Sequence, residues 1–126
     1  MKARIVSSAD ERIIAYKQQE NLAKLRKITD KLRIRLVIAE DNDAEDPIGF
    51  FAGFNGFEKS GKQGEADNGC IIFSGLSGKR IDAVLAELKK AELSIPLKAV
   101  LTPSNQKWSI KRLTAELAKE REKLGG

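Results

Sequence analysis

The chain has 126 residues, of which 41% are hydrophobic and 33% charged, and its net charge is +5. This length suits a single domain spanning residues 1–126, and the composition excludes a disordered or membrane-embedded protein. A single cysteine excludes an internal disulfide, and the absence of histidine excludes imidazole catalysis, Ser-His triads, Cys-His dyads and histidine-ligated metals.

The N-terminal sequence MKARIVSSADER lacks the long apolar core of a signal peptide. No apolar run approaches the roughly 18 residues of a membrane-spanning helix. We therefore expect a cytoplasmic protein that makes no contact with a membrane.

The charge is unevenly distributed, because residues 40–68 are acidic and both flanking regions are basic. A basic protein can bind nucleic acid through phosphates, but these lysines and arginines alternate with acids, as on an ordinary solvated helix face. Aromatic residues make up only 6% of the chain, which leaves no evident platform for base stacking. We therefore do not expect nucleic acid as a partner.

The first half of the chain contains two strands and two helices in alternation. Residues 13–16 (IIAY) and 34–39 (IRLVIA) are apolar runs typical of strands, and residues 4–6 are either a short extra strand or an ordered terminus. Between the two strands, apolar residues at helical spacing predict a helix over residues 21–33 with Asn21 as its N-cap. Asp46 and Pro47 predict the N-cap and first residue of a short helix that continues to Phe54.

Residues 55–69 contain four glycines and mixed charges. This composition predicts a flexible linker between the two halves of the chain.

The second half repeats the alternation with clearer start and stop signals. Residues 70–73 (CIIF) predict a buried strand, and the helix after it has Ser77 as its expected N-cap. Residues 97–102 (LKAVLT) predict another strand, which Pro103 ends. Ser109 is the expected N-cap of the last helix.

The same residues carry a resemblance to a known family. The sequence over residues 71–122 resembles the uncharacterised bacterial family known as domain of unknown function thirty-seven eighty-three, through its strand-end signature LKAVLTPxNxxW at residues 97–108. A weaker likeness extends through IIAY at residues 13–16 and PIGFFAG at residues 47–53. The family has no established activity, so the resemblance implies a domain and leaves its function open.

The alternation predicts a single α/β domain with a four-stranded, mostly parallel sheet built from two βαβα halves. We expect the strand order second, first, third, fourth. The alternative is a two-layer α+β arrangement with an antiparallel edge.

Neither a metal ion nor a cofactor is expected from the sequence. The acidic run at residues 41–46 does not have the spacing of a calcium loop, because Asp46 stands where the turn glycine belongs. A solvated turn is the simplest interpretation, and a loose Mg²⁺ site is the alternative. Cys70 begins an apolar strand, so we interpret it as a small buried hydrophobe and not as a nucleophile.

Two loops follow a strand and open a helix, which is where ligands commonly bind in open parallel sheets. If the third and fourth strands are parallel neighbours, both loops emerge at the same edge of the sheet, and their hydroxyls, amide and positive charges would suit an anion. The candidate ligand-binding residues are Ser74, Gly75, Ser77, Lys79, Thr102, Asn105 and Lys107. The alternative is that both loops are ordinary turns that only cap the helices after them.

Catalytic groups are scarce, so no catalytic residue is assigned. We expect a non-catalytic binding or interaction module whose partner is a small anion, another protein or a second copy of the chain. The alternative is a small enzyme that works without histidine and uses Lys, Ser/Thr or Asp/Glu groups.

Overall fold

The computed structural model describes residues 10–125, with side chains described as far as residue 123, so residues 4–6 lie outside the described part. Strands β1 (Arg12–Tyr16), β2 (Arg35–Ala39), β3 (Cys70–Ser74) and β4 (Lys98–Val100) form one sheet in the order β2-β1-β3-β4. This is the predicted order. The β1–β2 and β3–β4 pairs are parallel, as predicted for most of the sheet, whereas the central β1–β3 pair is antiparallel.

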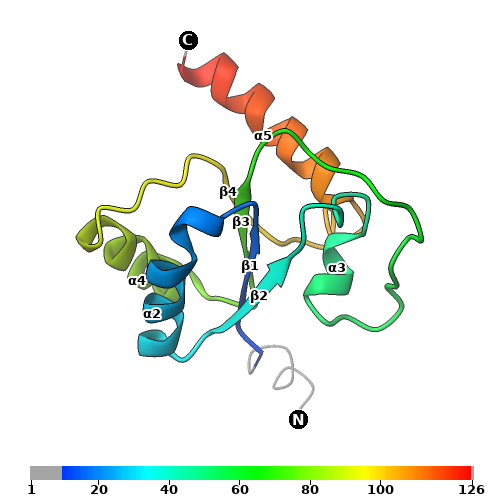
Figure 1. The fold of residues 1–126 in the computed structure, drawn as a ribbon. Coiled ribbons are helices and arrows are strands. Elements are labelled where there is room, and N and C mark those ends of the chain that lie inside the picture. The colour runs from blue at the N-terminus through cyan, green and yellow to red at the C-terminus, as the bar shows by residue number, and fades with distance from the viewer. Residues whose placement is uncertain (1–9, 126) are drawn as a thin grey trace.

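The helices cover both faces of the sheet (Figure 1). The 3₁₀ turn η1 (Gln19–Asn21) leads into α2 (Leu22–Leu32), which lies with α4 (Gly78–Lys90) on one face. The short α3 (Ile48–Phe51) and the long α5 (Ile110–Gly125) lie on the other face. Within residues 10–125, no helix is long and apolar enough to cross a membrane.

Alternate residues of the central strands supply the two halves of the core, because side chains of a strand point to opposite faces. Ile13 and Phe73 pack with Leu25 of α2 and with Val84 and Leu88 of α4. Ile14 and Ile72 belong to the opposite core, with Ile48 and Phe51 of α3 and with Ile110 and Leu113 of α5. Burial on both faces explains why β1 and β3 are nearly continuous apolar runs.

Serine caps begin α4 and α5, as the sequence predicts. The hydroxyl of Ser77 accepts a hydrogen bond from the Arg80 N–H at 3.2 Å, and the hydroxyl of Ser109 accepts one from the Arg112 N–H at 3.1 Å. Each bond satisfies a first-turn N–H that has no partner inside the helix.

One of the two caps predicted in the first half is wrong. Asn21 is the N-cap residue of α2, as predicted, although its side chain donates to the Gln18 side chain at 2.7 Å and makes no capping hydrogen bond. Pro47, not Asp46, is the N-cap residue of α3, which ends at Phe51 and not at Phe54. The Asp46 carboxylate instead accepts a hydrogen bond from the Ser60 N–H at 2.7 Å, so a contact distant in sequence outcompetes the local one.

The segment between the halves, residues 55–69, runs along the surface beside α3 and returns to the sheet (Figure 1). It has no helix or strand of its own, but Gly64 forms an isolated bridge with Asp43, and Ala66 is buried. Its flexibility stays a prediction, and these contacts mark the places where the segment is held.

Candidate functional site

The antiparallel β1–β3 pair gives the sheet strand carboxyl ends on both sides. β3 and β4 end at one side, whereas β1 and β2 end at the other, where Tyr16 of β1 is paired with Cys70 at the start of β3. Ligands of α/β proteins commonly bind beyond the carboxyl ends of strands. The two ends are therefore the first places to look for a site.

The loops predicted from the sequence emerge together at the β3–β4 end. β3 and β4 are parallel neighbours with Phe73 paired to Val100, and the Leu101 N–H donates to the Phe73 carbonyl at 2.9 Å. The loop after β3 enters α4 and the loop after β4 enters α5, so the two helices start on opposite faces of the sheet.

Several of the predicted ligand-binding residues at this end are buried or have a structural role. Ser74 is 2% exposed, Gly75 turns the chain with a φ of 78°, and Ser77 caps α4. Arg80, which would have added positive charge, forms two hydrogen bonds with the Glu11 carboxylate. Its guanidinium pKa is raised mainly by that side-chain hydrogen bonding.

The side chain of Asn105 is hydrogen-bonded to backbone groups on the outer edge of β4 and just after it. Its side-chain oxygen accepts from the Thr102 N–H at 2.8 Å, and its NH₂ group donates to the Val100 carbonyl at 3.1 Å. The Thr102 hydroxyl in turn accepts from the Asn105 N–H at 3.2 Å. Lys79 and Lys107 are exposed, so they are the predicted residues whose charges face solvent at this end.

At the β1 end of the sheet lies a cleft of about 560 Å³, which we call the β1-end cleft. Its volume lies within the range of roughly 300–1,000 Å³ that is usual for small-molecule sites. Four segments line it: the turn after β1, the residues before β3, the residues before β4, and the part of α5 that extends beyond the sheet (Figure 1). The lining residues are Lys17, Gln18, Gln19, Glu20, Asn21, Asn68, Gly69, Ser94, Pro96, Leu97, Ala118, Arg121 and Glu122.

The turn at Lys17 brings polar groups into this cleft. Lys17 has a φ of 54°, the left-handed conformation that non-glycine residues seldom adopt, and it directs the chain from β1 into η1. Its ammonium group holds the turn by donating to the Ala66 carbonyl at 2.7 Å and pairing with Glu65 at 2.9 Å. The hydrogen bond with Glu65 is the main reason why the Lys17 pKa is raised.

Gly69 is required where the cleft meets the backbone of β1. A Cβ at this position would lie 2.6 Å from the Lys17 carbonyl oxygen and 2.8 Å from that of Tyr16. Because such contacts are with rigid backbone, only glycine allows this close approach.

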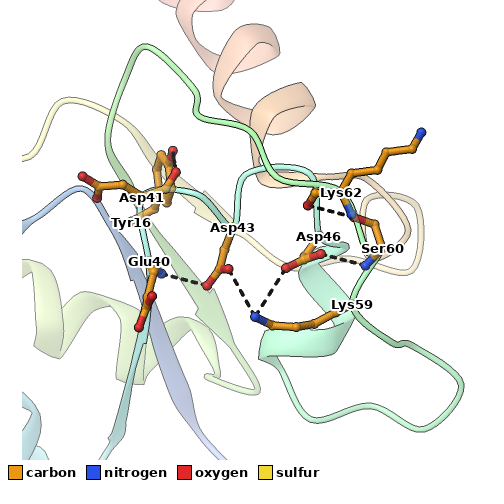
Figure 2. Close-up of polar contacts among 8 residues, drawn as sticks. All are labelled: Tyr16, Glu40, Asp41, Asp43, Asp46, Lys59, Ser60 and Lys62. Carbon is orange, nitrogen blue, oxygen red and sulfur yellow. Dashed lines mark hydrogen bonds and ion pairs between the residues drawn. The ribbon is translucent and has the colours of Figure 1, made fainter.

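An acidic loop follows β2 and contacts one lining residue of the cleft, Gln19, through Asp41. In Figure 2, Asp43 and Asp46 both point toward the ammonium group of Lys59, at 3.2 Å and 4.0 Å. Asp43 also accepts from the Glu40 N–H at 2.9 Å. The hydrogen bond to Asp43 is the main cause of the raised pKa of Lys59. Ion pairs with Lys59 thus hold this loop to the segment between the halves.

Tyr16 ties this loop to the segment between the halves. Its hydroxyl donates to the Asp41 carbonyl at 2.7 Å and accepts from the buried Ala66 N–H at 2.9 Å. Burial is the main cause of its raised pKa. Asp41 receives a further hydrogen bond from the Gln19 side chain at 2.8 Å, which connects the acidic loop directly to the lining of the cleft.

Reactive chemistry has little support among the described side chains. Cys70 is fully buried, and burial raises the pKa of its thiol to about 12, so the nucleophilic thiolate does not form near neutral pH. In the part of the chain that the structure describes, no group of three or more Cys, Asp or Glu side chains is placed to hold a metal ion.

Sequence reasoning missed the β1-end cleft because it assumed that the third strand runs parallel to the first. The run of amides directly after the apolar strand, at Gln18, Gln19 and Asn21, is the signal that could have found it. The Asn68-Gly69 pair before the third strand is a second signal.

Comparison with known proteins gives one result. Residues 70–124 match the model of a family described as Domain of unknown function (DUF3783), which confirms the resemblance seen in the second half of the sequence. Neither the curated proteins nor the solved structures gave a significant match.

Proposed function

We propose that this chain is a non-catalytic binding domain and that its ligand is a small zwitterionic molecule, such as a free amino acid or a short peptide, held in the β1-end cleft. The observation that carries the proposal is the lining of the cleft, which combines neutral amides, charges of both signs and one apolar wall. We also propose that the protein is bacterial and cytoplasmic, as expected from the sequence.

The amides favour a ligand that carries amide or carboxyl groups. Gln19, Asn68 and Ser94 are exposed at the cleft and offer donors and acceptors without net charge. Gln18 is 8% exposed and its side chain is fixed by the Tyr16 carbonyl at 3.3 Å and by Asn21 at 2.7 Å. Because this side chain is already ordered, the protein loses less conformational entropy when a ligand binds.

Charges of both signs favour a zwitterion over a simple anion. The guanidinium of Arg121 on α5 lines the cleft and attracts a carboxylate. Glu20 and Glu122 also line the cleft and attract an ammonium group. A multiply charged anion such as a nucleotide would be repelled by these two carboxylates.

The remaining wall is apolar and suits an aliphatic side chain or the carbon skeleton of a peptide. Pro96, Leu97 and Ala118 supply it from two different elements. Burial of the α carbon and side chain there would add roughly 25 cal/mol for each Å² of apolar surface removed from water.

A panel of free amino acids and dipeptides, tested by thermal shift and then by calorimetry, examines this proposal. We expect a saturable rise in melting temperature with some members of the panel. Ala118→Trp should remove this rise by filling the cleft, whereas Ala115→Trp, on an exposed position of α5 that does not line the cleft, should retain it. Equal responses of the two variants would contradict the proposed location.

A further inference from the structure

The two edge strands, β4 and β2, differ in how many of their outward backbone groups are hydrogen-bonded. On β4, the backbone groups that point away from β3 include the Val100 carbonyl and the Thr102 N–H, and Asn105 binds both. Its amide therefore takes the place of the N–H and C=O groups that an additional strand would offer. Edge strands that are not covered in this way are templates for pairing with another chain.

β2 is the other edge, and within residues 10–125 only its two ends are covered. The Arg35 N–H donates to the Glu11 carbonyl at 3.1 Å, so by alternation residues 35, 37 and 39 face β1 while residues 34, 36, 38 and 40 face outward. The Ile34 N–H is taken by the Thr29 carbonyl at 2.9 Å. The Glu40 N–H is taken by the Asp43 carboxylate, also at 2.9 Å (Figure 2).

Between these covered ends, the open groups are those of Leu36 and Ile38. Among residues 10–125, β2 pairs only with β1, and no other hydrogen bond is made by the outward N–H and C=O groups of Leu36 and Ile38. The window holds two donors and two acceptors. Ile38 is also one of the few large apolar side chains on the surface, with 44% of its area exposed.

We propose that this window of β2 pairs with β2 of a second copy of the chain, antiparallel about a two-fold axis at Val37, so that the two sheets become one. In this register Leu36 lies opposite Ile38 of the partner subunit, and the reverse pair forms on the other side of the axis. Both are hydrogen-bonded pairs, so the open donors and acceptors of both copies are all satisfied.

Neighbouring registers lose this match. A pairing centred on Leu36 would need the N–H of Ile34, which Thr29 already holds. A pairing centred on Ile38 would need the N–H of Glu40, which Asp43 already holds. The covered ends of β2 thus select the register centred on Val37.

Side chains complement each other in the same register. Leu36 and Ile38 belong to the face that α2 covers, so the Leu36 side chain meets that of Ile38 of the partner subunit and both lose apolar surface to water. This explains why an isoleucine is exposed near the end of an edge strand.

The charges along β2 are also self-complementary. Arg33 and Arg35 are at its start, and Glu40 and Asp41 follow its end. Antiparallel pairing brings the basic start of one β2 toward the acidic loop that follows the other. A parallel pairing would instead bring like charges together. The isologous arrangement is the one expected of a two-fold dimer.

Sedimentation equilibrium over a range of concentrations tests the dimer with two matched variants. Ile38→Lys and Val100→Lys each replace an exposed apolar residue of an edge strand by a lysine, with starting exposures of 44% and 46%. We expect the parent and Val100→Lys to approach twice the monomer mass as concentration rises, and Ile38→Lys to keep the monomer mass. Circular dichroism checks that both variants are folded.

A crosslink tests the register. Val37 lies on the proposed axis at a non-hydrogen-bonded pair, where the two Cα atoms are roughly 4.5 Å apart, a separation that a disulfide spans. Val37→Cys should therefore form a disulfide-linked dimer under mild oxidation. Arg35→Cys should not, since its two copies would be separated by about 13 Å along the strands. The native Cys70 is buried and does not compete.

Three results would overturn the proposal. They are a parent protein that stays monomeric at millimolar concentration, a dimer that Ile38→Lys leaves intact, and a dimer that Arg35→Cys crosslinks as readily as Val37→Cys. The β2 window does not line the β1-end cleft, so each of these results is independent of whether the cleft binds a ligand.

Discussion

The side-chain amide of Asn105 donates to the Val100 carbonyl at 3.1 Å, at the position where the N–H of a further parallel strand would lie. The same amide accepts from the Thr102 N–H, so one side chain satisfies both outward groups at the end of β4. The asparagine in the LTPSN sequence therefore closes a sheet edge. This role explains the residue without a ligand.

Replacing Asn105 tests this role. Asn105→Ala should lower the free energy of unfolding by roughly 1–2 kcal/mol, because two hydrogen bonds are lost. Urea unfolding followed by circular dichroism measures the change. Ser104→Ala, at the exposed neighbouring position, is the control and should be close to neutral. If the two variants unfold at the same urea concentration, the edge-closing role is wrong.

Tyr16→Phe tests how the segment between the halves is held. Removing the hydroxyl leaves the buried Ala66 N–H without its acceptor and the Asp41 carbonyl without its donor. We expect a loss of roughly 1–3 kcal/mol in stability. Limited proteolysis should also cut residues 55–69 faster in the variant than in the parent. Identical cleavage rates would show that Tyr16 does not restrain the segment.

The burial of Cys70 predicts a loss of stability at alkaline pH. Burial raises its pKa from 9.0 to about 12, so above pH 9 the unfolded chain releases this proton while the folded chain keeps it. The contribution of this thiol to the free energy of unfolding is therefore fully present below pH 9. It is lost between about pH 9 and 12, by up to about 4 kcal/mol at 1.36 kcal/mol for each pH unit. Urea unfolding of the parent and Cys70→Ala across this range isolates the effect. The free energy of unfolding of Cys70→Ala should fall less steeply with pH than that of the parent.

The elements of the second half were predictable because Gly69 and Gly75 bound one apolar run, and Pro96 and Pro103 bound the other. Ser77 and Ser109 act as caps because their partners are three residues away, a distance that sequence reasoning can see. Asp46 was misjudged because its carboxylate is taken by Ser60, fourteen residues later. The direction of β3 was not predictable, since the connection through α3 and residues 55–69 is long enough to enter the sheet from either end.

The strand-end loops at the β3–β4 side remain a testable anion site. If they bind, phosphate should shift the amide signals of residues 75–80 and 104–108 in NMR spectra, and replacing Lys79 and Lys107 by alanine should remove these shifts. Because Asn105, Ser77 and Arg80 are engaged in the fold, we expect the affinity to be no tighter than millimolar. Micromolar phosphate binding there would show that these groups rearrange.

The central claim, that the β1-end cleft binds a zwitterion, is tested most directly by mapping amide shifts while free amino acids and dipeptides are titrated into the ¹⁵N-labelled parent protein. We predict saturable shifts in residues 17–21, 94, 95 and 97 and in residues 118–122 of α5, with little change in residues 75–80. Shifts confined to the loops at the β3–β4 end, or no shifts at millimolar ligand, would contradict the claim.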